Sequence, residues 1–441
     1  MMMRKYFGTD GIRGKVGDFP LTPEFALKLG FAAGKVLATT PNATVLIGKD
    51  TRQSGDMLES ALSAGLTYAG VNVVLAGVLP TPAIAHLTMK HQMVAGIVVS
   101  ASHNPFYDNG IKFFNHLGEK LDDAVELSIE KAIDEPLVLP KNGELGTISH
   151  LLTASDEYVD FCYQSAEGLS LTGQKIVIDC AHGATYEVAP KLFKKLGATV
   201  IEVGTAPTGL NINDKVGSTS PEAIIERVKQ EKAHCGIAFD GDGDRLLIID
   251  EHGRPFDGDD ILYLLATARN EKAVVGTIMS NLGFELALKK RGIELLRSKV
   301  GDRYVLELLN EKSLTIGGEN SGHILCLDAH STGDGIIAAL QCLLTVTALK
   351  RSFGQILDEI PKTVQVMHNV RITKETTWDT PELKAAMEEI ETALDGEGRI
   401  LIRPSGTEPV VRVMVESHDH ALSEKHTIAL ADIIRASADQ A

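Results

Sequence analysis

The sequence predicts an α/β protein: three α/β domains with mixed, largely parallel sheets, followed by a smaller C-terminal α+β domain. Three observations lead to this prediction. With 441 residues the chain is too long for one hydrophobic core, and its length suggests about three domains. Short apolar, β-branched segments alternate with helical patterns over most of the chain. The final segment instead follows the order strand, helix, strand, strand, helix.

The expected strands of the buried sheets are almost continuously apolar. This pattern is typical of strands that helices cover on both faces. We expect such strands at residues 44–47, 71–75, 96–100, 175–179 and 235–240. A further strand is expected at 246–249 and a long helix at 335–350. In the tail the elements are expected at 364–372, 381–394, 399–403, 410–416 and 421–438.

Three breaks in the pattern indicate the domain boundaries. Residues 136–146 contain two prolines and two glycines, and similar breaks occur near 251–255 and 352–364. We therefore expect three α/β domains at 1–150, 151–252 and 253–363, and the α+β domain at 364–441. The three α/β blocks have similar sizes, but no close sequence repeat relates them.

Composition narrows the class of protein. The chain has 43 Lys and Arg against 59 Asp and Glu, a net charge of −16, which argues against a general nucleic-acid binder. A local group of basic residues still suits a small anionic substrate. The five cysteines have irregular spacing and no C-x-x-C pair, as expected for buried thiols in a reducing compartment. There is no apolar signal core or membrane-length apolar run, so we expect a cytoplasmic protein with no membrane partner.

An aspartate cluster is the strongest candidate metal site. Asp240, Asp242 and Asp244 alternate with Gly241 and Gly243, which allow the backbone to turn tightly enough for three carboxylates to converge. Such carboxylates repel one another unless a cation binds, so we favour a hard divalent ion over a solvated acidic turn. An EF-hand loop is disfavoured, because the glycine that it needs at its sixth position is replaced by Arg245. Arg245 is expected to support this loop or to contact a phosphate.

Ser102 is the candidate phosphoryl carrier. It follows an expected strand, and the carboxyl ends of strands in open α/β sheets are where ligands collect. The adjacent His103 is a further candidate catalytic residue, although the absence of a G-x-S-x-G elbow argues against an acyl-transfer triad. A serine that already carries a phosphoryl group needs no activating base. The alternative, a turn or helix-capping serine, becomes weaker when Ser102 is considered together with the aspartates.

Two basic segments are candidate phosphate contacts. The glycine-rich segment 8–14 places Arg13 on a loop, and residues 49–52 (Lys-Asp-Thr-Arg) follow an expected strand in a similar way. Lys112, ten residues after Ser102, is a candidate donor to the transferring oxygen. For each of these residues a surface charge or a flexible turn remains the alternative.

Residues 317–323 have the composition of a sugar-binding loop. Glu319, Asn320 and Ser321 offer groups that accept from and donate to hydroxyls, between glycines. His323 is the best-placed residue for proton transfer, since its ordinary pKa is near neutral. A polar turn with a satisfied histidine is the alternative.

Residues 403–412 have the composition of a phosphate-binding loop. A strand end opens into Arg403, Ser405, Gly406 and Thr407, and Arg412 follows. The spacing is not that of a P-loop, and an ordinary Gly/Pro turn is the alternative.

These segments, in this order, resemble the α-D-phosphohexomutase superfamily over essentially the whole chain. The opening GTDGIRG and the ASHNP around Ser102 resemble the branch that acts on glucosamine phosphate. The sugar loop departs from that branch, because Asn320 stands where the branch often has Gln. This difference bears on selectivity at the C2 substituent.

The resemblance implies a fold and a mechanism. Four domains would surround a central cleft, Ser102 would be the phosphoserine, and Asp240, Asp242 and Asp244 would hold one Mg²⁺ against it. Glucosamine 6-phosphate would become glucosamine 1,6-bisphosphate, which is both intermediate and activator, then glucosamine 1-phosphate for UDP-N-acetylglucosamine and cell-wall precursor synthesis. Glu319 and Ser321 would bind the sugar hydroxyls. The non-reacting phosphate would bind Arg403, Ser405, Thr407 and Arg412. A homodimer is one assembly that we consider.

Two other hypotheses remain open. One is a sister mutase acting on phosphomannose or phosphoglucose, distinguished by residues 319–323. The other is a catalytically idle regulator that binds metal and sugar phosphate. The joint presence of Ser102, Lys112, His323 and the aspartates argues against the regulator. A phosphatase is a weaker third option.

Overall fold

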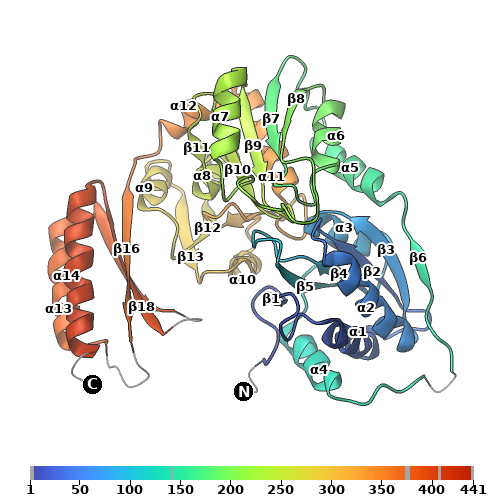
Figure 1. Ribbon diagram of the computed structural model, residues 1–441. Coiled ribbons are helices and arrows are strands. Elements are labelled where there is room, and N and C mark those ends of the chain that lie inside the picture. The colour runs from blue at the N-terminus through green and yellow to red at the C-terminus, as the bar shows by residue number, and fades with distance from the viewer. Residues whose placement is uncertain (1–3, 141–142, 373–377, 406–408, 439–441) are drawn as a thin grey trace. The chain divides into compact units, whose positions relative to one another are not determined.

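The computed structural model describes residues 4–140, 143–372, 378–405 and 409–438 (Figure 1). The chain separates into two compact units. The first comprises residues 1–279 and 296–357, and the second comprises 280–295 and 358–441.

The first sheet of the larger unit has six strands in the order β1-β5-β4-β2-β3-β6. β2, β3, β4 and β6 run parallel, whereas β5 and β1 add antiparallel pairs at one edge. All five residues of β4 are buried, which explains its continuous apolar sequence. The strands are β1 (Ile12–Lys15), β2 (Thr44–Lys49), β3 (Asn72–Val78), β4 (Ala95–Val99), β5 (Asp108–Asn115) and β6 (Ile148–His150). The helices are α1 (Pro23–Leu37), α2 (Gly55–Tyr68), α3 (Thr81–Lys90) and α4 (Asp123–Ile133).

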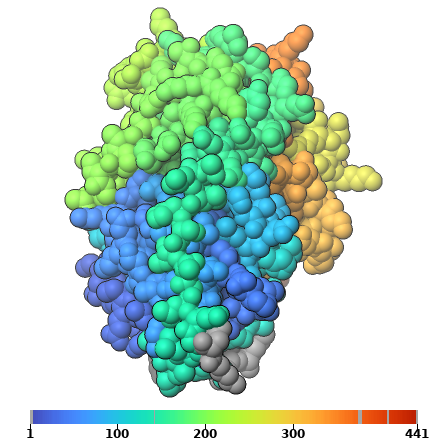
Figure 2. Space-filling model, turned by 90° about the vertical axis from the view of Figure 1, so that its right-hand side faces the viewer, coloured from blue at the N-terminus to red at the C-terminus, as the bar shows by residue number. Residues whose placement is uncertain are grey.

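The segment after α4 leads from the first sheet to the second. Its strand β6 pairs with β3 at the sheet edge, and all three β6 residues are exposed. Figure 2 shows this segment in green, running along the surface over the blue N-terminal part of the chain. The expected break at 136–146 lies just before β6.

The second sheet has the order β11-β10-β9-β7-β8. β7 is parallel to β8 and β9, and β10 turns back antiparallel to β9. This hairpin between β9 and β10 contains the three aspartates. The strands are β7 (Lys175–Asp179), β8 (Thr199–Val203), β9 (Cys235–Phe239), β10 (Leu246–Ile249) and β11 (Pro255–Phe256). The helices of this part are α5 (Ala154–Ser165), α6 (Val188–Lys195) and α7 (Glu222–Glu231).

The third sheet has four strands in the order β13-β12-β14-β15. Its helix α8 begins with a capping box in which Asp257 and Asp260 satisfy each other's backbone N–H groups. The strands are β12 (Ala273–Thr277), β13 (Glu294–Ser298), β14 (Ile316–Gly318) and β15 (Ile324–Cys326). The helices are α8 (Gly258–Ala268), α10 (Asp302–Lys312), α11 (Gly335–Leu349) and α12 (Phe353–Leu357).

The smaller unit contains a three-stranded antiparallel sheet of order β16-β18-β17. Val411, Val413 and Val415 of the central strand are fully buried against the helices of this unit. Buried Glu416 joins residues 280–295 to the sheet, because its carboxylate accepts from the Leu282 N–H at 2.8 Å and from Arg399 Nε at 2.7 Å. The elements are α9 (Leu282–Lys290), β16 (Val364–Arg371), α13 (Pro381–Leu394), β17 (Gly398–Pro404), β18 (Val410–Ser417) and α14 (His420–Ala438).

The expected α/β class is confirmed, including the antiparallel pairs that make the sheets mixed and the different order of the tail. All five cysteines lie within the described residues and are buried free thiols. No helix in the described ranges is both long and apolar enough to cross a membrane. The three domain boundaries expected from the sequence stay a prediction.

Candidate active site

Ser102 is buried at the carboxyl end of β4, three residues after the strand ends. Its backbone has φ of +51°, a left-handed conformation that is uncommon for a serine. The Ser102 Oγ donates to Asp240 Oδ2 at 2.5 Å. His103 Nδ1 lies 3.3 Å from Ser102 Oγ. The serine and the aspartate are 138 residues apart in the chain, and the fold brings them into direct contact.

The aspartate loop is a compact turn between β9 and β10. Gly243 has φ of +74°, and a Cβ at this position would lie 2.6 Å from Thr185 Cγ2, so only glycine fits. One oxygen from each of Asp240, Asp242 and Asp244 lies within 4.8 Å of the others, and all three residues are buried. The loop therefore concentrates three carboxylates at one point.

The donor set of this loop fits a hard divalent cation. Oδ1 of Asp242 and Oδ1 of Asp244 are buried and have no hydrogen-bond partner among the described residues. Burial, with the charges of Asp244 and Asp242, raises the pKa of Asp240 well above its ordinary value. Oxygens of this kind are the ligands that Mg²⁺ and Ca²⁺ prefer, and a cation here would satisfy both orphaned atoms.

Lys112, from β5, balances part of this charge. Its Nζ lies 2.7 Å from Asp242 Oδ2, 3.4 Å from Asp244 Oδ2 and 3.0 Å from Asp10 Oδ2. Burial alone would lower the pKa of Lys112, but these three carboxylates raise it above its ordinary value. Lys112 is therefore a cationic hydrogen-bond donor at neutral pH.

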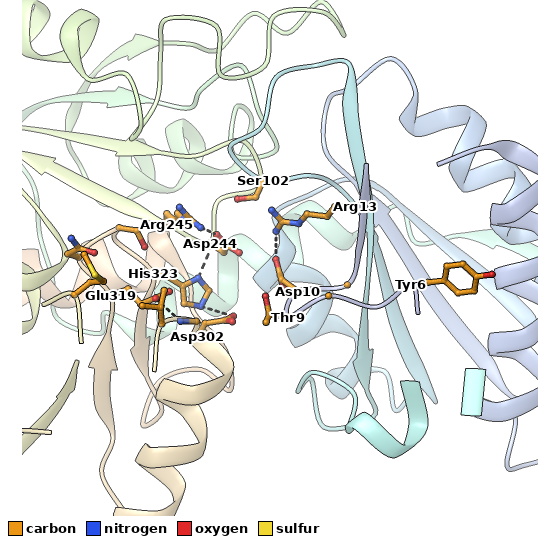
Figure 3. Close-up of a pocket in the computed structure, with 17 residues that line it drawn as sticks. Tyr6, Thr9, Asp10, Arg13, Ser102, Asp244, Arg245, Asp302, Glu319 and His323 are labelled. Carbon is orange, nitrogen blue, oxygen red and sulfur yellow. Dashed lines mark hydrogen bonds and ion pairs between the residues drawn. The ribbon is translucent and has the colours of Figure 1, made fainter. Parts of the chain in front are cut away.

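A ring of alternating charges continues from Lys112 around the site. Lys120 Nζ bridges Asp10 Oδ1 at 2.6 Å and Asp302 Oδ2 at 2.5 Å. His323 closes the ring, with Nε2 3.5 Å from Asp302 and Nδ1 3.7 Å from Asp244. Figure 3 shows Asp244, Asp302 and His323 of this ring close together, and Asp10 paired with Arg13.

Sequence reasoning missed three members of this ring, Asp10, Lys120 and Asp302. Asp10 lies within the glycine-rich segment 8–14, where the pattern indicates only Arg13 as a ligand contact. Lys120 and Asp302 are 182 residues apart, and no local motif marks either of them.

The two histidines of the site have opposite pKa shifts. Burial would lower the pKa of His323, but Asp244 and Asp302 raise it to about 9, so its imidazole is protonated at neutral pH. The pKa of His103 falls to about 4, because burial and the nearby Arg245 and Arg13 disfavour a positive charge. His323 is thus able to donate a proton but not to accept one, and His103 is neutral.

The expected sugar loop lies between β14 and β15, next to the aspartate loop. The Leu246 N–H donates to the Gly322 carbonyl at 2.9 Å, and this backbone contact joins the two loops. Glu319 Oε1 accepts from the Gly301 N–H at 2.9 Å. The Arg245 N–H donates to Asp240 Oδ1 at 3.2 Å within the aspartate loop.

These loops surround a cavity of about 520 Å³. Its walls combine carboxylates, guanidinium groups and small polar side chains, as a sugar phosphate requires. Tyr6 also lines it, although Figure 3 shows its ring well away from Ser102. The lining residues are Tyr6, Gly8, Thr9, Asp10, Gly11, Arg13, Ser102, Asp244, Arg245, Met279, Val300, Gly301, Asp302, Glu319, Asn320, Ser321 and His323.

The expectation that residues 49–52 contact a phosphate is wrong. Lys49 pairs with Asp56 and Glu59, and the Arg52 side chain is buried among backbone carbonyls. Its guanidinium is therefore already occupied by protein groups.

The expected phosphate loop belongs to the smaller unit. Arg403 and Arg412 are directly opposite each other on β17 and β18, so their side chains share one face of the sheet. Burial and the charge of Arg412 lower the pKa of Arg403. Ser405 follows β17, and its N–H donates to the Val410 carbonyl at 2.8 Å. Gly406 and Thr407 lie outside the described residues.

Comparison with protein families covers nearly the whole chain. Four models match in order, all described as phosphoglucomutase/phosphomannomutase: alpha/beta/alpha domain I at residues 4–137, domain II at 156–253, domain III at 257–364 and the C-terminal domain at 367–432. The chain therefore belongs to the phosphoglucomutase/phosphomannomutase family and is a mutase, as its resemblance to the phosphohexomutases predicted.

Curated relatives narrow the comparison within this family. A protein of Cupriavidus taiwanensis is 52% identical over 99% of this chain and 100% of its own length. One from Pasteurella multocida is also 52% identical with the same coverage, and one from Chromobacterium violaceum is 53% identical over 98% and 99%. Each of the three is named phosphoglucosamine mutase.

Solved structures share the fold at low sequence identity. A phosphoglucomutase/phosphomannomutase family protein from Burkholderia thailandensis has a TM-score of 0.81 at 24% identity, covering 99% of this chain and 98% of its own. An Aspergillus fumigatus N-acetylphosphoglucosamine mutase, solved with GlcNAc-6P and magnesium, has a TM-score of 0.70 at 16% identity, covering 99% and 96%.

Proposed function

We propose that this mutase interconverts glucosamine 6-phosphate and glucosamine 1-phosphate through a phosphorylated Ser102 and a glucosamine 1,6-bisphosphate intermediate. The observation that carries the proposal is the contact of Ser102 Oγ with Asp240 inside the aspartate cluster, at the wall of a polar cavity of sugar-phosphate size. The relatives named phosphoglucosamine mutase support the choice of sugar. The product would supply UDP-N-acetylglucosamine synthesis.

One Mg²⁺ per chain is the metal that we propose for Asp240, Asp242 and Asp244, with an oxygen of the Ser102 phosphate as a further ligand. When bound, this ion neutralises charge on the phosphoryl group and orients it for transfer. Arg245 supports the loop through its N–H bond to Asp240.

In the forward direction, the sugar O1 attacks the phosphorus of phosphorylated Ser102, and the bond from phosphorus to Ser102 Oγ breaks. Overall, the proton of the O1 hydroxyl is transferred to the departing Ser102 Oγ, which becomes a hydroxyl again. The charged Lys112 and Arg13 stabilise the negative charge on the transferring oxygens. After the bisphosphate turns around, Ser102 Oγ attacks its 6-phosphoryl group and the bond from phosphorus to O6 breaks. The proton that the Ser102 hydroxyl releases balances the one that O6 takes up. His323, protonated and near Asp244, is able to donate a proton to the sugar oxygen that leaves.

Substrate orientation is assigned to two groups of residues. Glu319, Asn320 and Ser321 would bind the sugar hydroxyls, whose pattern they are able to match with both acceptors and donors. Arg403, Ser405, Gly406, Thr407 and Arg412 would hold the phosphate that does not react. Two arginines on one sheet face repel each other, and a phosphate dianion relieves this repulsion.

Other aspects of the proposal concern the whole chain. We propose domains at 1–150, 151–252, 253–363 and 364–441. Five buried free thiols support a cytoplasmic location. A homodimer remains a proposal that light scattering would test.

A coupled assay tests the function directly. Glucosamine 6-phosphate, Mg²⁺ and a trace of glucosamine 1,6-bisphosphate are supplied, and mannose and glucose phosphates are tested in parallel. Formation of glucosamine 1-phosphate with the highest kcat/KM supports the proposal. Preference for mannose or glucose phosphate overturns the choice of sugar and retains the mutase, and Asn320 would be the first residue to exchange for Gln.

A further inference from the structure

Arg52 lies at the centre of the Ser102 loop. Its Nη2 donates to the carbonyl oxygens of Ser102 at 3.0 Å and Asn104 at 2.8 Å. Its Nη1 donates to the carbonyls of Pro105 and Asp108, the latter at 2.9 Å. The guanidinium of Arg52, a residue only 3% exposed, thus binds four carbonyls from the seven-residue stretch 102–108, which contains Ser102.

A carboxylate from the same segment orients Arg52. Asp50 Oδ2 accepts from Arg52 Nε at 2.8 Å and from Ser100 Oγ at 2.5 Å. The Ser102 N–H in turn donates to Ser100 Oγ at 3.0 Å. The backbone of Ser102 is therefore held on both sides, at its N–H through Ser100 and at its carbonyl through Arg52.

Asn213, from the loop that follows β8, contacts two of the same carbonyls. Its Nδ2 lies 2.9 Å from the Ser102 oxygen and 3.0 Å from the Asn104 oxygen. A Cβ added to Gly241 of the aspartate loop would lie 2.5 Å from the Ser102 oxygen and 2.8 Å from Asn213 Nδ2. The Ser102 carbonyl is thus the point where the serine loop, Arg52, Asn213 and the aspartate loop meet.

These contacts surround a serine whose backbone is left-handed, with φ of +51°. A left-handed backbone at a non-glycine residue persists only where surrounding contacts determine it. The direction of the Ser102 Oγ toward Asp240 depends on that backbone conformation. Without the donors, the loop is free to relax, and the oxygen would move away from the aspartate cluster.

We propose that Arg52, assisted by Asn213, is a positioning residue for phosphoryl transfer: it holds the carbonyls of the Ser102 loop so that Ser102 Oγ faces Asp240. The inference rests on the proposed function, and it assigns no contact with substrate to either residue. It predicts that loss of Arg52 lowers kcat and leaves KM nearly unchanged, because the cavity lining is intact. Misplacement by about 1 Å is enough for a loss of about 100-fold in rate.

Kinetic measurements on four variants test the proposal: Arg52→Ala, Arg52→Lys, Asn213→Ala and the double variant Arg52→Ala/Asn213→Ala. We expect Arg52→Ala to lose about 100-fold in kcat. Arg52→Lys should lose less of its kcat, because the lysine ammonium replaces some of the N–H donors of the guanidinium. Asn213→Ala should lose least, since Arg52 still holds both shared carbonyls. The double variant should lose more than the product of the single losses, because in each single variant the other residue still holds the shared carbonyls.

A matched control separates positioning from general stability. Arg254 also places Nε on a buried aspartate, Asp250 at 2.6 Å, and Nη2 on a backbone carbonyl outside the Ser102 loop, that of Gly354 at 3.0 Å. Its side chain is more exposed, at 33% against 0% for Arg52. Arg254→Ala should lower the melting temperature and leave kcat near the wild-type value. Methylguanidinium, which replaces the missing guanidinium, is added well below the concentrations that unfold the protein. It should raise the kcat of Arg52→Ala toward the wild-type value and should not change the kcat of Arg254→Ala.

A second readout does not depend on turnover. Intact-mass spectrometry follows the uptake of phosphate by Ser102 from glucosamine 1,6-bisphosphate, and Arg52→Ala should slow this uptake in proportion to kcat. Wild-type kcat in Arg52→Lys and Asn213→Ala, or a rise in KM alone, would overturn the proposal. If Arg52→Ala does not fold, the kcat values of Arg52→Lys and Asn213→Ala decide whether the proposal holds. If the wild-type protein isomerises no sugar phosphate, the proposed function fails, and the phosphate-uptake rates still test the inference.

Discussion

At the scale of single residues, Ser102 depends on distant parts of the chain. Its oxygen contacts Asp240, its carbonyl contacts Asn213, and its loop surrounds Arg52. None of these contacts is local in sequence. The chemistry of Ser102 is therefore a property of the packed molecule, even though the residue itself is recognisable in the sequence.

Ser102→Ala should abolish mutase turnover, because the phosphoryl group then has no carrier oxygen at Asp240. We expect the rate to fall at least about 1,000-fold in the coupled assay with bisphosphate present, a loss typical of removing the nucleophile from an enzyme site. Ser63→Ala is the control, since Ser63 is equally buried and lies in α2 away from the site. Near wild-type turnover of Ser102→Ala would remove the phosphoserine assignment.

Gly243→Ala tests the geometry of the aspartate loop. A left-handed φ costs an alanine about 1–2 kcal/mol, and the close approach to Thr185 adds about 1–3 kcal/mol of crowding. Gly77→Ala is the control, because Gly77 has φ of +77° and a Cβ added there would meet nothing within 4 Å among the described residues. Urea unfolding and calorimetric titration with Mg²⁺ measure the two effects. We expect both variants to lose stability and only Gly243→Ala to lose metal affinity as well.

At the scale of elements, a histidine pair joins α3, α5 and the loop before α11. His86 stacks on Phe161 with ring centroids 3.8 Å apart, and His330 packs edge-on against the same ring at 5.2 Å. His330 is held as the neutral tautomer, because Nε2 donates to the Pro82 carbonyl at 3.2 Å and Nδ1 accepts from the Thr332 N–H at 3.2 Å. Burial and the nearby His86 lower the pKa of His330 to about 3.

This pKa shift predicts how stability depends on pH. Between the native pKa of about 3 and the unfolded value of about 6.5, the unfolded chain binds a proton that the native protein does not bind. The contribution of His330 to the free energy of unfolding is therefore complete above pH 6.5. It decreases as the pH falls and is about 2 kcal/mol smaller at pH 5. Urea unfolding of wild type and His330→Gln at pH 7 and 5 measures it. The variant should lose less stability on acidification than wild type does, whereas exposed His420→Gln should match wild type. Equal pH dependence in all three proteins would contradict the shift.

At the scale of the whole molecule, the smaller unit contains the two cross-strand arginines. We expect Arg403→Ala to raise KM for the sugar phosphate about 10-fold or more, since a charge-assisted contact to phosphate is worth roughly 1.5–3 kcal/mol. Mg²⁺ affinity should not change, because Arg403 is not part of the aspartate cluster. Steady-state kinetics and calorimetry measure the two quantities. The control is Arg435→Ala on α14 in the same unit, where Arg435 pairs with Asp432. An unchanged KM in Arg403→Ala would remove the phosphate-binding role.

The elements that depend on local pattern were predictable from the sequence. The expected helix at 381–394 is α13, the strand at 246–249 is β10, and the tail strands agree with β16, β17 and β18 within one or two residues. Continuous apolar runs and Gly/Pro breaks report burial and turns directly, because they follow from the side chains of adjacent residues. The same holds for the aspartate loop, whose three carboxylates and two glycines are consecutive.

The sequence by itself thus determined the α/β class, the aspartate loop and the family that the order of the motifs resembles, and it led to the proposal for Ser102. Only the tertiary structure decided that Asp10, Lys120 and Asp302 form a charged ring with His323, and that Arg52 binds carbonyls rather than phosphate. The physical reason is the distance along the chain at which each interaction forms. A turn or an apolar strand is encoded by neighbouring residues, whereas an ion pair across 182 residues or a guanidinium buried by another loop exists only once the sheets have packed.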